Sequence, residues 1–358
     1  MTAGRRSTTV AVDVNPAVRD VQTGTEAYAR EVSRRLPEVA PDLRFIFYAS
    51  RPSEIAGVDL TVLPGRRLWS QLRLPVELWS RRPDVFFAPS HVVPFLAPGR
   101  TVTAVHDLAF ERHPGAYRPR DLAYLRLTTR WAARRCRLLL TVSWSTALDL
   151  VELYGVDPDR LRVVPLGGGE PLEGGVDSGQ AGRRLAALGV DGPFALHVGR
   201  VEPRKNQLTA LAAVERLDSL LLVCAGPVVD DEVATRLRRS RHCRVLGRVS
   251  DSDLESLYAQ AEVLLFPSLY EGFGLPVLEA MRRGVPVVTV AVSSLPEVGG
   301  SAAIFVEDPL DAEGLATAVE EAIAQRPELA RLGRAQAARF TWHRTAKAVA
   351  QALREAAS

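Results

Sequence analysis

Two glutamates, eight residues apart, frame the stretch of this 358-residue chain whose residue types are best suited to chemistry. Glu271 lies in a turn-forming run at 267–274, directly after an apolar segment at 263–266, and Glu279 lies on the first turns of the helix that follows. The glycines of the run let backbone approach a ligand closely, and a helix start offers unpaired N–H groups to an anion. Such a corner can hold a diphosphate, with Glu279 on the hydroxyls of a ribose and Glu271 on a second sugar. The alternative is an ordinary strand–loop–helix corner with two solvated glutamates.

The ends of this helix are signalled by two residues. Pro276 suits the first turn, where its missing N–H costs nothing, and Gly284 suits the position just past the last turn. The segment at 263–266 is expected to be a buried strand that leads the chain into the turn.

The stretch at 266–300 resembles the nucleotide-sugar motif of glycosyltransferase family 4, whose members retain the anomeric configuration. His197-Val198-Gly199-Arg200, followed by Arg204-Lys205-Asn206, resembles that family's basic phosphate-binding loop. Leu246-Gly247-Arg248-Val249 resembles its nucleobase-binding turn, and 286–296 matches the strand and turn that usually follow. Together these motifs cover most of the second half of the chain. The resemblance implies a retaining glycosyltransferase of GT-B architecture.

The resemblance also implies roles for individual residues. Catalytic roles fall on His106, Arg204, Lys205 and Glu271. Donor contacts fall on Gly24, Gly199, Arg200, Val249, Gly272, Phe273, Gly274, Leu275 and Glu279. Arg200, Arg204 and Lys205 would neutralise the diphosphate and the charge that grows on it as the sugar leaves. The alternative for Arg204 and Lys205 is a solvated loop.

No metal or other cofactor is expected, because a cationic pair can replace a divalent metal at a diphosphate. Asp251-X-Asp253 has a spacing that could suit metal ligands, but its position favours a helix start and cap. Lysine occurs only at Lys205 and Lys347 in a chain rich in arginine. A lysine in the phosphate loop therefore indicates a need for a compact, mobile ammonium, unless it fell there by chance.

In the first half of the chain, His106 ends a predicted strand at 102–106 and resembles the family's cleft histidine, which contacts the transferred sugar. A purely structural role is the alternative. Asp107 can either orient the imidazole or cap the following turn, and His91 and His113 are weaker candidates. Thr23-Gly24-Thr25 lies where the family usually has a glycine pair, so Gly24 either contacts the ligand or simply starts a helix.

We find no carboxylate suited to attack the far face of the sugar, and the resemblance implies a front-face mechanism. In that mechanism the acceptor hydroxyl attacks on the side the nucleotide leaves, and the departing phosphate oxygen takes its proton. The protein then supplies positioning and electrostatics rather than covalent chemistry.

The elements that must position these residues alternate between strand and helix, which is typical of parallel sheets covered on both faces. We expect strands at 8–14, 43–49, 84–88, 102–106, 138–142, 194–198, 220–224, 244–246, 263–266 and 287–290. We expect helices at 23–39, 68–81, 120–135 and 145–154, and a nearly all-helical end at 311–357. The predicted fold class is α/β, with two doubly wound, Rossmann-like parallel-sheet domains facing each other across a cleft.

The predicted domains are an acceptor-binding domain at 1–168, a glycine-rich linker at 169–185 and a nucleotide-sugar-binding domain at 186–340. Two domains are also what the length of the chain favours. In this family the last helix often crosses back onto the first domain, so the helix at 341–357 is a candidate for that position.

Composition narrows the class of protein. Apolar residues make up 47% and charged residues 24%, as in soluble globular proteins, and no apolar run approaches the roughly 20 residues needed to span a bilayer. Three scattered cysteines argue against a disulfide framework or a zinc site, and a net charge of +3 is too small to indicate nucleic acid. The polar N-terminus favours a cytoplasmic location. Arginines and Trp131 in the helix at 118–137 can rest on an anionic membrane surface, which would suit a lipid-linked acceptor, or they form a solvated face.

The expected activity is transfer of a hexose from a nucleotide-diphosphate sugar to a saccharide or glycolipid acceptor. The first candidate donor is GDP-mannose, and UDP- or dTDP-sugars are also possible. The alternatives are a nucleotide-sugar epimerase of the same architecture and a non-catalytic nucleotide-sugar-binding protein. A nicotinamide dehydrogenase is disfavoured because the first strand runs into Asn15-Pro16 rather than into a G-X-G-X-X-G loop.

Overall fold

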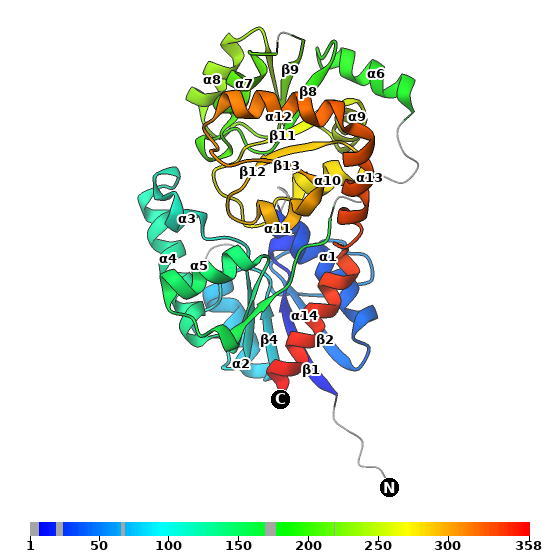
Figure 1. Cartoon of the computed structure of the whole chain (residues 1–358). Coiled ribbons are helices and arrows are strands. Elements are labelled where there is room, and N and C mark those ends of the chain that lie inside the picture. Colours follow the sequence, from blue (N-terminus) through cyan, green and yellow to red (C-terminus); the bar gives the residue numbers. More distant parts are fainter. Residues whose placement is uncertain (1–6, 19–23, 66–68, 169–176, 218) are drawn as a thin grey trace. The chain divides into compact units, whose positions relative to one another are not determined.

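The computed structural model describes residues 7–18, 24–65, 69–168, 177–217 and 219–358. The chain divides into two compact units. Unit 1 comprises Met1–Gly167 together with Thr341–Ser358, and unit 2 comprises Gly168–Phe340. Each unit contains one sheet with helices on both of its faces (Figure 1).

Unit 1 is built on a seven-stranded sheet in the order β3-β2-β1-β4-β5-β6-β7, and every strand pair is parallel. The strands are β1 (Thr8–Asp13), β2 (Leu43–Ala49), β3 (Leu60–Val62), β4 (Val85–Ala88), β5 (Thr101–Val105), β6 (Leu138–Thr141) and β7 (Leu161–Val163). Every residue of β4, β5 and β6 is buried. Because helices cover both faces, these strands are continuous runs of β-branched and apolar residues.

The helices of unit 1 are α1 (Gly24–Val39), α2 (Leu74–Arg81), α3 (Ala109–Arg112), α4 (Pro119–Arg135), α5 (Trp144–Tyr154) and α14 (Trp342–Ala357). Three 3₁₀ turns lie at Pro16–Val18, Pro114–Ala116 and Pro158–Arg160, and a π-helical turn at Trp69–Arg73 leads into α2. One hydrophobic core joins α2, α4 and α5 to the same face of the sheet. Helix α14 packs along α1 and against β4, β5 and β6, with Val349 and Leu353 fully buried.

Unit 2 is built on a six-stranded sheet in the order β10-β9-β8-β11-β12-β13, again with only parallel pairs. The strands are β8 (Phe194–Val198), β9 (Leu221–Ala225), β10 (Cys243–Gly247), β11 (Val263–Phe266), β12 (Val287–Val290) and β13 (Ile304–Val306). The helices are α6 (Ser178–Ala187), α7 (Gln207–Val214), α8 (Asp231–Arg239), α9 (Asp251–Gln260), α10 (Leu275–Arg282), α11 (Leu295–Gly299), α12 (Ala312–Ala324) and α13 (Arg326–Ala337), with 3₁₀ turns at Pro203–Lys205 and Gly300–Ala302.

The predicted fold class of two doubly wound parallel-sheet domains is confirmed, and several local predictions are too. Pro276 lies in the first turn of α10, and Gly284 follows the end of that helix with a φ of +73°. The three cysteines are free and buried. Within the described ranges, no helix combines the length and the apolar character that crossing a bilayer requires.

The structure differs from the sequence predictions at several elements. Strands β3, β7 and β13 were not predicted, and each is a half-buried segment of three residues. The first half of the predicted linker, 169–176, lies outside the described residues, but its second half begins helix α6. Helix α6 packs against α9, with Arg184 Nη1 3.1 Å from Asp253 Oδ1.

The start of α9 also differs in detail from the prediction. The capping side chain is Ser250, whose Oγ accepts a hydrogen bond of 3.2 Å from the Asp253 N–H. The two aspartates instead lie in the first turn, where their negative charge interacts favourably with the positive end of the helix dipole.

In each sheet there is one point where the chain reverses the direction in which it adds strands. In unit 1 this point lies between β1 and β4, and in unit 2 between β8 and β11. Open parallel sheets bind ligands beyond the carboxyl ends of the strands at such a point, because the flanking loops diverge there. The loops after β1, β4, β8 and β11 are therefore the places to look for ligand-binding residues.

Candidate active site

The basic loop of unit 2 follows β8 and closes in the 3₁₀ turn at Pro203–Lys205. Its backbone is pressed against the loop after β9. A Cβ on Gly226 would lie only 2.0 Å from the Gly199 carbonyl oxygen, so only glycine fits at that position. Arg204 and Lys205 are 7% and 9% exposed, which excludes the solvated loop that was the alternative for them.

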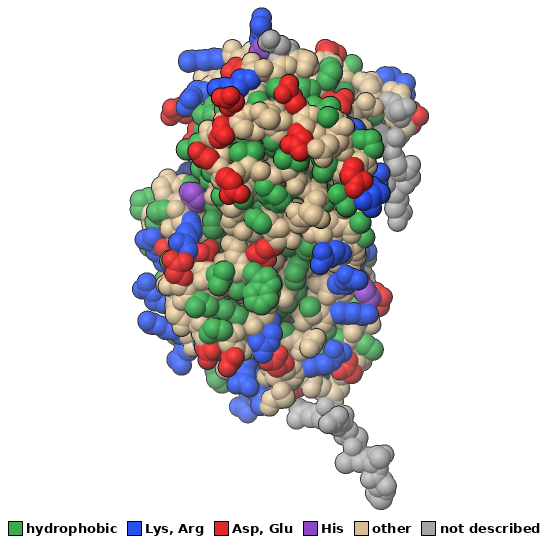
Figure 2. Space-filling model, in the orientation of Figure 1, with side chains coloured by type: hydrophobic (Ala, Val, Ile, Leu, Met, Phe, Trp, Pro, Cys, Tyr) green, Lys and Arg blue, Asp and Glu red, His purple; other side chains and the backbone are tan. Residues whose placement is uncertain are grey.

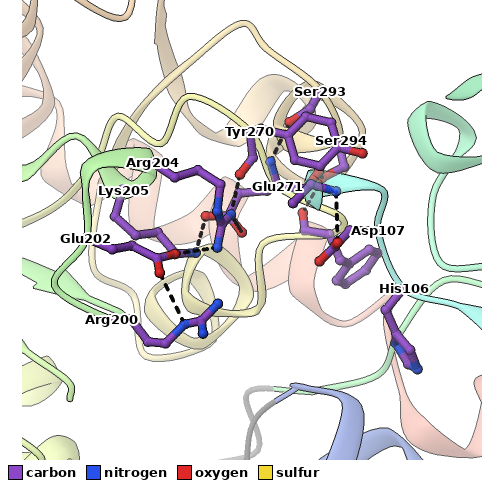
Figure 3. A network of polar contacts seen from close by, with 12 residues as sticks. His106, Asp107, Arg200, Glu202, Arg204, Lys205, Tyr270, Glu271, Ser293 and Ser294 are labelled. Atoms are coloured by element: carbon purple, nitrogen blue, oxygen red, sulfur yellow. Dashed lines mark hydrogen bonds and ion pairs between the residues drawn. The ribbon is translucent and has the colours of Figure 1, made fainter. Parts of the chain in front are cut away.

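Arg204 and Lys205 converge on Glu271, which comes from the loop after β11 (Figure 3). Lys205 Nζ donates a hydrogen bond to Glu271 Oε1, and Arg204 Nη1 lies 3.7 Å from Glu271 Oε2. Arg204 also donates to the Tyr270 carbonyl oxygen at 2.6 Å. The network therefore joins the two loops that flank the switch point of this sheet.

A further carboxylate, Glu202, belongs to the same network. Its Oε1 accepts from Arg204 Nη2 at 2.7 Å, and its Oε2 lies 3.6 Å from Arg200 Nε. Arg200 is the exposed member of the group, with 47% of its side chain accessible. Three cations and two carboxylates leave the network with one net positive charge, which favours an anionic ligand.

Burial and charge act in opposite directions on the ionisable groups of this network. Burial lowers the pKa of Lys205, and the neighbouring Glu271 carboxylate opposes that shift. Burial would raise the pKa of Glu271, but the charges of Lys205 and Arg204 outweigh it and hold that pKa below its usual value of 4.5. Glu271 is therefore a carboxylate at neutral pH and can accept hydrogen bonds from sugar hydroxyls.

Two serines hold the turn that contains Glu271. The Glu271 N–H donates to Ser293 Oγ at 2.9 Å, and Ser294 Oγ lies 3.0 Å from the Glu271 carbonyl oxygen and 2.9 Å from that of Phe273. Gly274 precedes helix α10 with a φ of +108°, a conformation that L-residues rarely adopt.

The side chain of Phe273 is buried and packs edge-on against Phe340. Within the part of the chain that the structure describes, the backbone N–H groups of Phe273, Gly274 and Leu275 donate to no other group. These three donors are where the sequence predicts contacts with phosphate and sugar.

Glu279 lies outside this network. It is half-buried, and its Oε2 accepts a hydrogen bond of 2.7 Å from the Tyr258 hydroxyl. Burial raises the pKa of Glu279 above its usual value. With Glu271 only 8% exposed, the alternative of two solvated glutamates is excluded, whereas the ribose-binding role of Glu279 stays a prediction.

The predicted nucleobase turn begins with Leu246 and Gly247, the last two residues of β10, at the edge of the sheet. The Gly247 carbonyl oxygen accepts from the Gly226 N–H at 2.8 Å, which ties this turn to the loop after β9. Val249 is half-buried. Its contact with a base stays a prediction.

In unit 1, His106 follows β5. Its Nε2 lies 2.8 Å from the Pro89 carbonyl oxygen, its ring meets the Tyr28 ring edge-on at 4.9 Å, and burial lowers its pKa. Asp107 Oδ1 accepts from the Ala109 N–H at 3.0 Å, which favours the capping role over orientation of the imidazole.

Gly24 is the first residue of α1, which agrees with a helix start. Thr23 of the same predicted motif lies outside the described residues, so the ligand contact proposed for this motif has no structural description.

The structure thus brings Arg200, Arg204, Lys205 and Glu271 together, and it adds three residues that sequence reasoning missed. Glu202, Ser293 and Ser294 orient the cations and the turn. Glu202 could have been found, because it is a carboxylate that lies between Arg200 and Arg204 in the sequence. Nothing in the sequence indicates that Ser293 and Ser294 form hydrogen bonds with the turn that contains Glu271. Among the described residues, no group of three or more His, Cys, Asp and Glu side chains is placed to hold a metal ion.

Comparison with known proteins places the chain in a family. Residues 184–339 match the family described as Glycosyl transferases group 1, and residues 23–167 match Glycosyltransferase Family 4. O-antigen chain mannosyltransferase B of Escherichia coli is 31% identical over an alignment of 294 residues, which covers 78% of this chain and 74% of that protein. The chain belongs to glycosyltransferase family 4. This family-4 protein is therefore a glycosyltransferase.

Other relatives are similar over different shares of their length. The serotype-specific mannosyltransferase WbdA of E. coli is 28% identical over 84% of this glycosyltransferase, which spans only 40% of that relative. Among solved structures, Anabaena Alr3699/HepE in complex with UDP and glucose has a TM-score of 0.76 at 16% identity. That likeness covers 98% of this chain and 100% of the other, and it shows the shared fold.

Proposed function

We propose that this glycosyltransferase moves a hexose, with mannose as the first candidate, from a nucleotide-diphosphate sugar to a saccharide or glycolipid acceptor. The observation that carries the proposal is the buried network of Arg204, Lys205 and Glu271. It combines two cations for a diphosphate with an ionised carboxylate for a sugar, at the point of the sheet where ligands are expected.

The chemistry follows from these charges. The diphosphate would lie against Arg200, Arg204 and Lys205 and the free N–H groups at the start of α10. Negative charge grows on the diphosphate as the glycosidic bond breaks, and fixed cations in a site with little water stabilise that charge without reorganising. Cations already held in place can stabilise the charge on the leaving diphosphate without a metal ion. Glu271 would bind hexose hydroxyls, and the acceptor hydroxyl would attack on the side the diphosphate leaves, with retention.

The identity of the donor is proposed from the relatives. Two of them are named mannosyltransferases, which supports GDP-mannose as the donor. The structural neighbour that contains UDP and glucose keeps UDP-sugars in consideration, and dTDP-sugars remain a further option.

The test is an incubation with GDP-mannose, UDP-glucose and dTDP-glucose in turn, with and without mannobiose, and analysis of the products by mass spectrometry and anomeric NMR. We expect an elongated saccharide with a retained anomeric configuration from GDP-mannose. A donor sugar altered in the absence of acceptor would indicate the epimerase instead. Tight binding of a donor with no product from a broad panel of saccharide and glycolipid acceptors would indicate a non-catalytic binding protein.

We also propose that unit 1 contacts an anionic membrane surface, as a lipid-linked acceptor would require. Among the described residues, nine of the eleven exposed large hydrophobic side chains belong to α2, α4, α5 or the segments beside α2. They are Leu72, Val76, Trp79, Leu96, Tyr124, Leu127, Trp144, Leu148 and Leu153. Figure 2 shows hydrophobic side chains gathered over α5 on the face in view.

Arginines accompany these side chains on α4. Arg130 and Arg134 are exposed and form no ion pair with any described residue, so their charge is available to anionic lipids. Trp131, which the sequence placed on this face, is instead half-buried against Phe95.

Co-sedimentation with vesicles of phosphatidylglycerol or of phosphatidylcholine tests this contact. We expect binding to the anionic vesicles only, weakened in Trp79→Ser and Leu127→Ser but not in Leu310→Ser, which alters an exposed leucine of unit 2. Equal sedimentation with both vesicles, or equal loss in all three variants, would contradict the proposal.

A further inference from the structure

One imidazole at the ligand-binding edge of unit 1 has buried nitrogens with no partner. His91 follows β4, one of the two strands that flank the switch point of this sheet. Both of its ring nitrogens are buried, and neither forms a hydrogen bond with any described residue. Buried polar side-chain atoms nearly always have a partner, so two unpaired nitrogens on one ring need an explanation.

The loop that carries His91 is fixed by its neighbours. The Pro89 carbonyl oxygen lies 2.8 Å from His106 Nε2, and the Ser90 carbonyl oxygen accepts from Thr103 Oγ1 at 2.8 Å. The His91 ring itself packs against Phe110, with 5.9 Å between ring centroids. The imidazole is therefore held in place by packing while its nitrogens stay unused, as in a preformed binding site.

A second unpaired group lies at the same edge. The Tyr28 hydroxyl is buried and has no hydrogen-bond partner among the described residues, and the Tyr28 ring contacts His106 edge-on. His106 in turn is close enough to His91 to influence its titration. Two unpaired polar groups thus neighbour the histidine that the sequence singled out.

The protonation of His91 indicates which ligand would suit it. Burial lowers its pKa to about 4, the Asp107 carboxylate opposes that shift, and the nearby His106 adds to it. The ring is therefore neutral at neutral pH, so one nitrogen donates a hydrogen bond and the other accepts one. A hydroxyl group also donates and accepts, whereas a phosphate or carboxylate would favour a charged imidazolium.

We propose that His91 binds a hydroxyl group of the acceptor saccharide, and that the Tyr28 hydroxyl supports the same site. This inference rests on the proposed transfer reaction and names a residue of unit 1 that positions its acceptor. His91 is a binding residue here, and no bond-making step is assigned to it.

The test separates acceptor binding from folding and from donor chemistry. His91→Phe keeps an aromatic ring of similar shape but removes both nitrogens, whereas His91→Asn and His91→Gln each keep a donor and an acceptor. With GDP-mannose as donor and mannobiose as acceptor, we expect His91→Phe to raise the acceptor KM about tenfold or more, as for loss of a hydrogen-bonded pair. The donor KM and the hydrolysis of donor without acceptor should not change, and Asn or Gln should restore part of the acceptor affinity. His343→Phe, at an exposed histidine of α14, is the matched control.

The outcomes distinguish this inference from the function on which it rests. If the wild type transfers no sugar with any donor and acceptor tested, the proposed function fails. If the wild type is active and His91→Phe keeps the acceptor KM of the wild type, this inference alone is overturned. It is also overturned if acceptor KM, donor KM and donor hydrolysis all deteriorate together, because that pattern indicates a structural role. If His91→Phe does not fold, His91→Leu, which also removes both nitrogens, takes its place, and a wild-type acceptor KM in that variant overturns the inference.

Discussion

Replacement of Lys205 by methionine isolates the ammonium of the phosphate loop. Methionine keeps most of the length and apolar bulk of the stem, so the change removes the charge with little change in packing. Lys205 Nζ is the hydrogen-bond partner of Glu271 Oε1, and both side chains are about 90% buried. The variant therefore leaves a buried carboxylate with one cation fewer.

The magnitude can be worked from the distances. Breaking a buried ion pair by removing one partner costs about 3–5 kcal/mol. Arg204 Nη1 remains 3.7 Å from Glu271 Oε2 and retains an attraction of roughly 4 kcal/mol at an effective dielectric constant of about 20. We therefore expect the lower end of the range, about 3 kcal/mol, which corresponds to a melting temperature roughly 6–12 °C lower for a domain of this size.

The effect on turnover should exceed what the loss of stability explains. An electrostatic donor aimed at developing charge contributes about 10²–10³-fold to turnover, and Lys205 is proposed to act on the departing diphosphate. Turnover at saturating donor is measured below the melting temperature of the variant, alongside thermal unfolding. Lys347→Met is the matched control, since it removes the chain's other lysine from an exposed position on α14. Lys205→Arg should recover part of the rate by restoring charge with a different geometry. A folded Lys205→Met protein with wild-type turnover would refute this reasoning.

Two further predictions concern the ribose carboxylate and the loop packing. Nucleotide affinity should fall as the pH drops through the raised pKa of Glu279, because only the carboxylate accepts both ribose hydroxyls. Tyr258→Phe should shift that loss of affinity to higher pH, because the hydrogen bond from the Tyr258 hydroxyl lowers the pKa of Glu279. Nucleotide affinity is measured by calorimetry at a series of pH values. An affinity that does not change with pH would contradict the ribose-binding role of Glu279. Gly226→Ala should displace the Gly199 carbonyl and destabilise unit 2 by about 1–3 kcal/mol or more in denaturant unfolding. Gly182→Ala, in open space on α6, should instead stabilise by up to about 1 kcal/mol, and similar effects of the two would contradict the packing argument.

The central strands could be predicted because the residues of each segment are themselves of the types found in buried strands. The segments at β11 and β12 consist of apolar and β-branched residues, and β8 is apolar except for the buried His197, as expected of strands covered on both faces. Strands β3, β7 and β13 could not be predicted. Three half-buried residues are too few to show a period, and only pairing with a neighbouring strand makes them part of the sheet.

In the candidate site too, residues could be found from their own segments of sequence, whereas their partners from other segments could not. Arg204 and Lys205 could be found because their loop resembles the family's basic phosphate-binding loop, but their burial could not, because arginine and lysine in a loop are usually solvated. Glu279 was found from its distance to Glu271, yet its partner Tyr258 comes from the preceding helix α9. Partners of this kind are set by how helices pack, and one sequence does not record that directly.

Helix α14 makes the order of synthesis matter for folding. The last helix of the sequence shown covers α1 and the central strands of unit 1, whereas all of unit 2 is encoded between the two parts of unit 1. During translation, unit 2 can fold around its own core before Val349 and Leu353, which are buried in the core of unit 1, have left the ribosome. The N-terminal part of unit 1 therefore keeps an exposed apolar face until α14 has been synthesised. An isolated fragment ending at Gly167 would keep that face exposed and would tend to aggregate.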